Sequence, residues 1–477
     1  MGLTKSRVSQ IERGEISTVD AIARHVQAIF EGIEGLYNRR GRHSAGSAAR
    51  PPRIRGLEVE MYVAGLRVSG VRGFAGARSA DLRLTRPDGA HAGWTVLAGR
   101  NGAGKTTLLR TIALALAGPF NARALMPSFD GWVTAGAAEG QVKAEIIFDS
   151  DWDSFTGKGN RPKHAFRVDL TWLNEPSPGE PSRSVGLKST GSTAERGPWT
   201  DRPRGWFCAG YGPFRRLIGG SADAQRLMLA YGPVSRLASL FNEDASLAES
   251  VSWLVDLHLR QLEQRPGAAE LLSFVLSLLN DGLLPDGFRV LRVDSDGLWA
   301  SRDDDVIPLR EMSDGYRTVT ALVLDLVRQL HQVHGSEAAS VEALANTPGV
   351  VLIDEIDVHL HVSWQKKIGE WLKSHFPRIQ FIVSSHSPYI CQSADPGGLI
   401  RLPGLGEDVP PRVVDEDLYE RVVYGSGDDA LPGFRRQCSA LQGGGEADPP
   451  AERDRESPVA PGRSGARRGL PGQPCLN

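Results

Sequence analysis

The sequence is poor in the features that mark secreted, disulfide-linked or membrane-spanning proteins. Its four cysteines are scattered, and none belongs to a C-x-x-C pair, which excludes a disulfide framework and a zinc site of the usual spacing and indicates a reducing compartment. It has no apolar run of about 18 residues, the length of a membrane-spanning helix, and its N-terminus carries charges without a long apolar stretch. We therefore expect no membrane contact, no signal peptide and a cytoplasmic location.

The chain also has no excess of charge of either sign. Its 55 Lys and Arg residues nearly balance its 57 Asp and Glu residues, which gives the 477 residues a formal net charge of −2. Any contact with nucleic acid would therefore require a local basic patch, because there is no global positive field. The apolar fraction of 40% is ordinary for a globular protein, and the length suffices for one large domain with appendages.

One stretch carries a specific chemical signal. Residues 99–107 read Gly-Arg-Asn-Gly-Ala-Gly-Lys-Thr-Thr, which is the G-x-x-x-x-G-K-S/T spacing of a phosphate-binding loop. Lys105 can reach the outer phosphates, and the hydroxyl of Thr106 can bind Mg²⁺. An apolar run precedes the loop and leucines at helical spacing follow it, so we predict that it opens a helix whose N-terminus favours phosphate. The predicted phosphate-contacting residues are Gly99, Arg100, Asn101, Gly102, Ala103, Gly104, Lys105, Thr106 and Thr107.

Two adjacent acids, Asp354 and Glu355, directly follow a second apolar run at 349–353. Such a pair is costly beside a buried strand unless it is used. Asp354 can hold Mg²⁺ next to the phosphate loop, and Glu355 can orient or deprotonate an attacking water. A helical pattern and the apolar run 380–384 complete a βαβ unit, which ends in His386. Because ligands of open α/β sheets bind at the carboxyl edge, His386 is a candidate contact for the γ-phosphate.

Shifts in composition divide the chain. Residues 1–34 carry helical patterns, and the first resembles the recognition helix of Cro/repressor-type helix-turn-helix regulators, without the two helices that precede it in that family. We expect residues 35–60 to be a flexible linker, 61–437 to be the main domain, and 438–477, which have few core-forming residues, to be a disordered tail.

Alternating apolar residues between 62 and 170 predict an antiparallel side sheet attached to a parallel core sheet that carries the phosphate loop. Residues 173–205, rich in Pro, Gly, Ser and charge, predict a mobile loop, and residues of about 215–285 predict a helical lobe. No heptad pattern is sustained, so we expect no long coiled coil. The expected fold is an α/β phosphate-loop NTPase with a mixed core sheet.

Ser313-Asp-Gly315-Tyr precedes a strongly amphipathic helix. The phosphate loop, this signature, the acidic strand end, Asp357 and His386 occur in the order found in ATP-binding cassette ATPases of the RecF/SMC-like group. Over roughly residues 61–430 the chain resembles the AAA-family ATP-binding proteins of virulence or defence islands.

That resemblance implies an ATPase that works as a head-to-tail homodimer with two ATP molecules at its interface. Lys105, Glu355 and His386 would be its catalytic residues, and Thr106 and Asp354 would hold Mg²⁺. Ser313 and Gly315 would contact the γ-phosphate of the nucleotide held by the other copy, and Asp357 would belong to the loop that communicates across the interface.

The family's glutamine loop has no clear counterpart here. The stretch 207–216, which looks like a motif of this subgroup, contains no glutamine, and Gln141 is a weak candidate that more simply reads as an exposed strand residue. Arg215 and Arg216 could equally neutralise phosphate charge or solvate the start of a helix. His359 and His361 suggest a metal, but they lack a third ligand.

We interpret the chain as a Mg²⁺-dependent ATPase that couples ATP-driven closure to DNA or to a separate effector protein, in a role of the DNA-repair or phage-defence type. A transporter ATPase subunit is an alternative, although the signature lacks Gly-Gly-Gln and lies farther from Asp354 than in transporters. A DNA-binding regulator that uses residues 4–14 would lack supporting helices. A fused nuclease, as in the OLD family, would need a second acidic cluster that the tail lacks.

Overall fold

The computed structural model describes residues 62–414, apart from 86–92, 164, 177–182, 202, 216–220, 231, 285, 304, 336–337 and 339. The segments expected to be a helix-turn-helix remnant (1–34), a linker (35–60) and a disordered tail (438–477) lie outside the described residues.

A parallel sheet forms the centre of the described domain, with the strand order β14-β13-β3-β12-β11-β7. Only β14 at its edge runs antiparallel to its neighbour. The strands are β3 (Trp94–Ala98), β7 (Cys208–Tyr211), β11 (Gly349–Ile353), β12 (Ile379–Ser385), β13 (Leu399–Arg401) and β14 (Arg412–Val413).

An antiparallel sheet of order β2-β1-β4-β5-β6 lies beside the core sheet, and a smaller one of order β10-β9-β8 lies in the helical part of the chain. The first contains β1 (Tyr62–Ser69), β2 (Ala80–Arg83), β4 (Glu139–Ile147), β5 (Ala165–Pro176) and β6 (Arg183–Thr190). The second contains β8 (Arg289–Asp294), β9 (Gly297–Arg302) and β10 (Asp305–Pro308).

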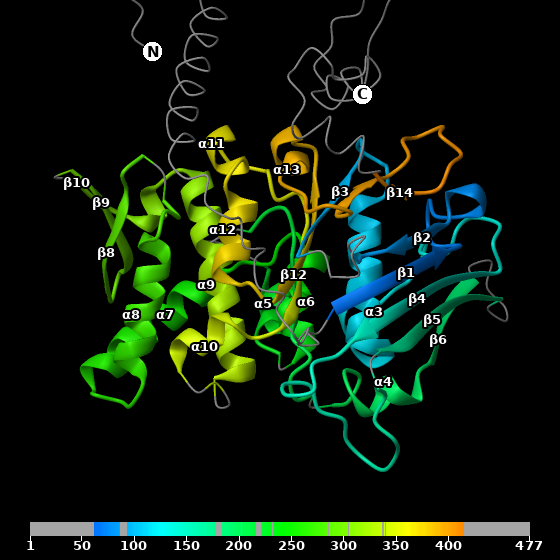
Figure 1. Ribbon diagram of the computed structural model, residues 1–477, viewed down its shortest axis with the longest axis horizontal. Helices are drawn as coiled ribbons and strands as arrows, with labels where there is room; N and C mark the ends of the chain where they lie inside the picture. The colour runs from blue at the N-terminus through cyan, green and yellow to red at the C-terminus, as the bar shows by residue number, and fades with distance from the viewer. Residues whose placement is uncertain are drawn as a thin grey trace, which may run out of the picture. The chain divides into compact units, whose positions relative to one another are not determined.

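Helices cover the core sheet on both faces (Figure 1). Before the small sheet come η1 (Gly76–Arg78), α3 (Lys105–Leu125), α4 (Ser192–Arg196), α5 (Ala222–Met228), α6 (Pro233–Phe241), α7 (Ala248–Leu262) and α8 (Ala268–Asn280). After it come η2 (Leu309–Glu311), α9 (Asp314–His334), α10 (Val341–Ala345), α11 (Val362–Gln365), α12 (Ile368–His375) and α13 (Pro388–Gln392).

Strand β11 shows how the two apolar cores are divided. All five of its residues are buried, as expected for a parallel strand with both faces covered. Val350 and Leu352 pack into the core that contains α3 and the five-stranded sheet, whereas Val351 and Ile353 pack into the core that contains α7, α8 and α9. Helix α3, which begins at the phosphate loop, therefore lies between the two large sheets.

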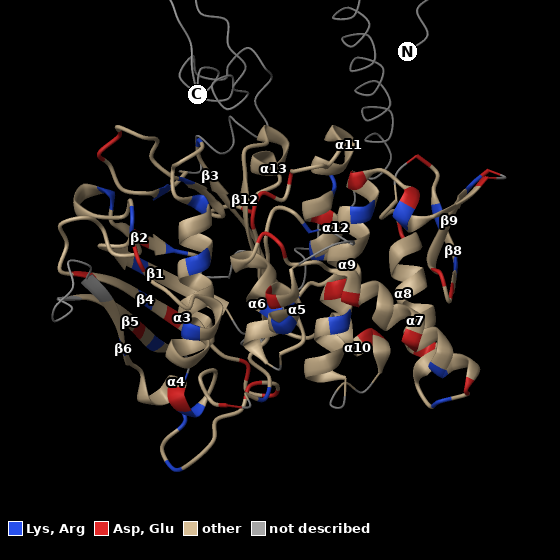
Figure 2. Cartoon of the chain, turned by 180° about the vertical axis from the view of Figure 1, so that it is seen from behind, with Lys and Arg blue, Asp and Glu red and all other residues tan. Residues whose placement is uncertain are grey.

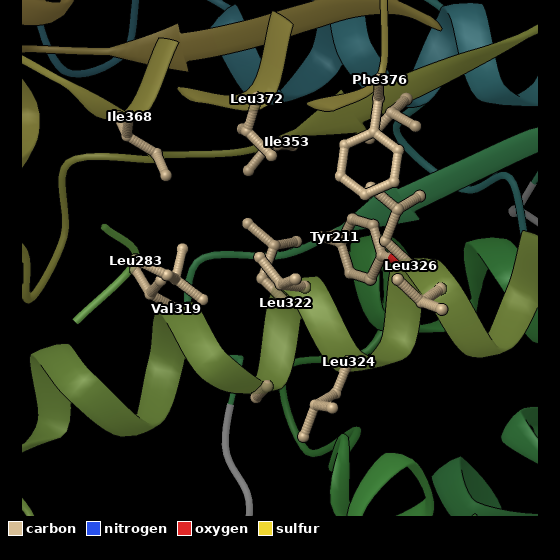
Figure 3. Packing of buried hydrophobic residues seen from close by; sticks show 14 of the residues in the cluster. Tyr211, Leu283, Val319, Leu322, Leu324, Leu326, Ile353, Ile368, Leu372 and Phe376 are labelled. Atoms are coloured by element: carbon tan, nitrogen blue, oxygen red, sulfur yellow. The ribbon is translucent and has the colours of Figure 1, made fainter. Parts of the chain in front are cut away.

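Helix α9 presents its apolar stripe to the other face of the core sheet. Figure 3 shows Val319, Leu322 and Leu326 of α9 facing Ile353 and the α12 residue Leu372, whereas Leu324 points away from this layer. The expected α/β fold, with a parallel core sheet and an antiparallel side sheet, is confirmed. Helix α9 has 21 residues, and α3 spans the same number but is kinked at Gly118, whose φ is 82°, so the described residues contain no long coiled coil.

Residues 173–205, for which we expected a mobile loop, instead contain the end of β5, strand β6 and helix α4. Trp199 links the described part of this stretch, after β6, to helix α3. Pro119 lies inside α3 and has no N–H to donate to the carbonyl of Ala115. The indole N–H of Trp199 donates to that carbonyl at 3.0 Å instead, so the stretch is bound to the helix that follows the phosphate loop.

Candidate functional site

The phosphate-loop motif lies where the sequence places it, between β3 and α3. Gly102 and Gly104 have φ values of 78° and 96°, in the left-handed region that favours glycine. A Cβ atom on Gly104 would lie 2.8 Å from the ring of Phe74, so this position cannot carry a side chain without movement. No side chain in the described structure caps the N-terminus of α3, which suits a helix end that binds an anion.

The register of the core sheet explains which residues meet at this edge. Ala98 of β3 lies opposite Ser385 of β12, so Gly99 follows β3 at the level where His386 follows β12. Ile353 of β11 lies opposite Val383, so Asp354 lies beside Ser384. Parallel pairing therefore brings the phosphate loop, the acid pair and the histidine together at the carboxyl edge.

Lys105 lies at the centre of this group. Its ammonium donates to the Gly99 carbonyl at 3.0 Å and to Nε2 of His386 at 2.7 Å. Since an ammonium has no acceptor, Nε2 of His386 must accept and the ring proton lies on Nδ1. Burial lowers the pKa of Lys105, against the opposing attraction of Glu355 and Asp354. Burial, aided by the charge of Lys105, also lowers the pKa of His386, which keeps the imidazole neutral at pH 7.

Asp354 joins the helix of the phosphate loop to the core sheet. Its side chain is buried and accepts hydrogen bonds from Thr106 Oγ1 at 2.7 Å and from Ser384 Oγ at 2.5 Å. A hydroxyl beside a carboxylate matches the protein ligands of Mg²⁺, which fills its remaining positions with phosphate oxygens and water. Thr106 and Asp354 therefore fit the metal that the sequence predicts.

Glu355 sits on a strained turn directly after Asp354. Its φ is 45°, which is uncommon for a residue with a side chain. Its N–H donates to Ser384 Oγ at 2.8 Å, and its Oε1 lies 3.7 Å from Nε2 of His386, too far for a hydrogen bond. The carboxylate is about one-third exposed, so it borders the buried lysine while remaining open to water.

Arg215 does not have the solvating role considered from the sequence. Its side chain is buried, so it does not solvate a helix start, and its guanidinium donates to backbone carbonyls, including that of Asp354 at 2.9 Å. Burial lowers the pKa of Arg215 to about 10, so it stays charged at neutral pH. Arg216 lies outside the described residues.

The loop that follows the acid pair reaches the signature of the same chain. Asp357 accepts from Ser385 Oγ at 2.5 Å. A Cβ atom on Gly315 would lie 2.6 Å from the carbonyl oxygen of His359, so the glycine allows α9 to approach this loop. Ser313 is exposed at the N-terminus of α9, and among the described residues no hydrogen bond joins it to the phosphate loop.

Two weaker candidates are accounted for by local structure. Gln141 lies on β4, and its amide donates to both carboxylate oxygens of Asp169, at 3.0 and 3.1 Å. His361 caps α11. No group of three His, Cys, Asp or Glu side chains that could hold a metal occurs within the described residues, so nothing adds a third ligand to His359 and His361.

Two residues that shape the site, Ser384 and Ser385, were not predicted from the sequence, and the carbonyl partners of Arg215 were not predicted either. Both serines directly precede the predicted histidine in the run Ser384-Ser385-His386-Ser387, and this excess of hydroxyls at the end of an apolar strand was the available signal. Nothing near Arg215 indicated that its partners would be carbonyls more than 130 positions away.

Two family models match the chain. Residues 66–177 match one described as "AAA domain", and residues 243–392 match one described as "AAA domain, putative AbiEii toxin, Type IV TA system". Each covers less than half of the chain. The first match contains the phosphate loop, and the second contains the signature, the acid pair and His386.

Curated relatives show the same likeness. The chain is 27% identical over 317 residues to the Septu protein PtuA of Bacillus mycoides (strain KBAB4), an alignment that covers 66% of this chain and 37% of that protein. It is 46% identical over 85 residues to the Retron Ec83 probable ATPase of Escherichia coli, over 18% of this chain and 15% of that protein. The chain thus spans little more than a third of the first relative and far less of the second.

Among solved structures, the chain is similar to one described as "Crystal structure of the SmcHead bound to the C-winged helix domain of ScpA", with a TM-score of 0.44 and 16% identity over 74% of this chain and 97% of that one. None of the helices in the described residues is long and apolar enough to cross a membrane. The phosphate loop, the acid pair and His386 thus lie in two stretches of the chain that are similar to AAA domains.

Proposed function

We propose that this chain binds ATP together with Mg²⁺ and hydrolyses it. The observation that carries the proposal is the convergence of Lys105, Thr106, Asp354, Glu355 and His386 at one edge of the core sheet. These residues come from three parts of the chain, and hydrogen bonds of 2.7 Å join Lys105 to His386 and Thr106 to Asp354. The matches to AAA domains and to a relative described as a probable ATPase support the same activity.

Each residue has a task that its surroundings suit. The glycine-rich turn and Lys105 hold the outer phosphates. Thr106 and Asp354 hold Mg²⁺, which would neutralise phosphate charge when bound. Glu355, partly exposed beside the buried lysine, orients the attacking water and accepts its proton. His386 is neutral with a proton on Nδ1, and its Nε2 is already directed at the lysine that meets the phosphates.

We further infer that ATP closes a homodimer through the signature at the start of α9. Ser313 is exposed there, whereas Gly315 packs against the loop that contains Asp357. This arrangement leaves Ser313 free to meet a nucleotide held by a second copy, while Asp357 and its loop link that contact to the acid pair. Because closure needs two nucleotides, ATP shifts the equilibrium toward the dimer by mass action.

We propose that closure of the dimer acts on a separate effector protein, in a role of the defence type. The similarity to Septu PtuA and to a retron ATPase supports that role. In the part of the chain that the structure describes, Lys and Arg residues are interspersed with Asp and Glu (Figure 2). This mixture favours an effector protein over direct binding of DNA, which needs a local excess of positive charge.

The test of the ATPase is phosphate release by the purified chain, with and without EDTA, for the wild type, Lys105→Ala and Lys143→Ala. Lys143 is a half-exposed lysine on β4 that pairs with Asp169, and it serves as the matched control. We expect Mg²⁺-dependent release by the wild type and the control, and none above background for Lys105→Ala. Release that survives EDTA, or that persists in Lys105→Ala, would contradict the proposal.

A further inference from the structure

Arg215 is a buried cation whose hydrogen bonds go to main-chain carbonyls. Its Nη1 donates to the carbonyls of Gly212 at 3.0 Å and Asp354 at 2.9 Å. Its Nη2 donates to those of Glu355 at 3.2 Å and Ile356 at 3.4 Å. One guanidinium therefore donates hydrogen bonds to three consecutive carbonyls of the turn that carries the acid pair.

That turn needs such a donor because of its shape. The φ of Glu355 is left-handed, and the carbonyls of Asp354, Glu355 and Ile356 all meet the guanidinium of Arg215. Buried carbonyls without a donor are strongly disfavoured, and a strained backbone persists only where its surroundings hold it. Without the guanidinium, we expect the turn to relax and its carboxylates to move.

The opposite side of the turn is held by Ser384. Its hydroxyl accepts from the Glu355 N–H and donates to the Asp354 carboxylate, while its carbonyl accepts from the Ile356 N–H at 3.1 Å. The amide side of the turn is thus bound to β12 and the carbonyl side to Arg215.

Arg215 is itself firmly placed. The backbone N–H of Asp354 donates to the carbonyl of Tyr211, the last residue of β7, at 2.8 Å. A Cβ atom on the next residue, Gly212, would lie 2.3 Å from the carbonyl oxygen of Ser239 in α6, so the loop that carries Arg215 is pressed against that helix. The loop that carries Arg215 is therefore held by its contact with α6, and not only by its hydrogen bonds to the acid turn.

We propose that Arg215 is a positioning residue that fixes the carboxylates of Asp354 and Glu355 for the hydrolysis of ATP by binding the carbonyl side of their turn. The proposal rests on the proposed function. A general loss of stability would affect the whole chain. The loss of a positioning role is instead expected to lower the rate of hydrolysis and to speed hydrogen exchange only at the amides of the acid turn.

The experiment compares Arg215→Met and Arg215→Lys with Arg236→Met, a matched control. Arg236 is also buried, and its Nε donates to the carbonyl of Cys208 at the start of β7, so it binds a main-chain carbonyl away from the acid turn. For each variant, kcat, the Kd of ATP and amide hydrogen exchange across residues 354–358 are measured on the folded, full-length chain. Arg215→Lys keeps a buried cation and supplies the comparison if Arg215→Met does not fold.

We expect Arg215→Met to lower kcat about 100-fold, the size of effect that a misplacement of about 1 Å can cause, with the Kd of ATP changed by less than about threefold. Arg215→Lys should fall between the wild type and Arg215→Met, because one ammonium cannot match three carbonyls. Exchange at residues 354–358 should be faster in both. Arg236→Met should change neither kcat nor this exchange.

Two results would overturn the proposal: unchanged kcat and exchange in Arg215→Met, or equal losses of kcat in Arg215→Met and Arg236→Met. Failure of the proposed function is read separately, from a wild-type chain that does not hydrolyse ATP. In that case, unchanged exchange at 354–358 in Arg215→Met would still show that Arg215 does not hold the turn.

Discussion

Thr106 Oγ1 lies 2.7 Å from Asp354 Oδ2, although 248 positions separate the two residues in the chain. Thr106 lies in the first turn of α3, and Asp354 directly follows β11. The pair forms because β3, β12 and β11 are parallel and end at the same edge. It gives the site a hydroxyl and a carboxylate in contact, the combination that a Mg²⁺ ion with bound phosphates requires.

We predict that Asp354→Asn raises the Mg²⁺ concentration needed for half-maximal ATPase activity by at least about tenfold. The amide keeps the size of the side chain but removes the negative charge that a hard cation prefers. The measurement is phosphate release against Mg²⁺ concentration. Asp169→Asn is the control, because Asp169 lies on β5 and accepts its hydrogen bonds from Gln141, away from the phosphate loop. An equal shift in both variants would contradict the assignment of Asp354.

A second prediction concerns dimer formation. In a Glu355→Gln background with saturating ATP, we expect light scattering to give the mass of a dimer, and we expect Ser313→Arg to restore the mass of a monomer while ATP still binds. The reason is steric, since Ser313 is exposed where the second copy would meet it. Ser277→Arg, an exposed serine on α8, should leave the dimer intact. A dimer that forms despite Ser313→Arg would rule out this interface.

A third prediction follows from His334, which is fully buried among Trp152, Phe207 and Arg236. Burial lowers its pKa from 6.5 to about 3. Below pH 6.5 the unfolded chain therefore binds a proton that the folded chain does not, and folding becomes less favourable by up to about 1.4 kcal/mol per pH unit until about pH 3. His334→Phe keeps a ring in this position and removes the penalty.

The measurement is the difference in Tm between His334→Phe and the wild type from pH 7.5 to pH 5. We expect this difference to shift in favour of the variant as the pH falls. Asp153 acts in the opposite direction, because burial raises its pKa to about 7 and the folded chain then keeps a proton that the unfolded chain loses. Since both proteins contain Asp153, its contribution cancels. A Tm difference that does not change with pH would contradict this account of His334.

The fold and the centre of the site could be predicted from the sequence because their signals are local. Gly99 to Thr107 form a continuous motif, Asp354 and Glu355 follow a fully apolar run, and the stripe that begins at Val319 repeats at helical spacing. The carboxyl ends of parallel strands meet at one edge of a sheet. Residues that directly follow these strands could therefore be predicted to lie close together.

The parts that could not be predicted depend on partners far away in the chain. Trp199 bonds the carbonyl that Pro119 leaves free, and composition alone cannot reveal that pairing. Arg215 lies in a loop with glycine and proline, where a charge usually indicates exposure. Strands β8 to β10 are short and carry many charged residues, so their pattern is weak.

The most direct test of the central claim is the fate of ATP bound to Glu355→Gln. The glutamine keeps the size of the side chain and removes its charge and basicity. We expect the variant to bind γ-labelled ATP with Mg²⁺ at an affinity within a few-fold of the wild type and to retain it uncleaved, while Glu270→Gln, an exposed glutamate on α8, cleaves it at the wild-type rate. Cleavage by Glu355→Gln at the wild-type rate would contradict the assignment of Glu355 as the residue that acts on water.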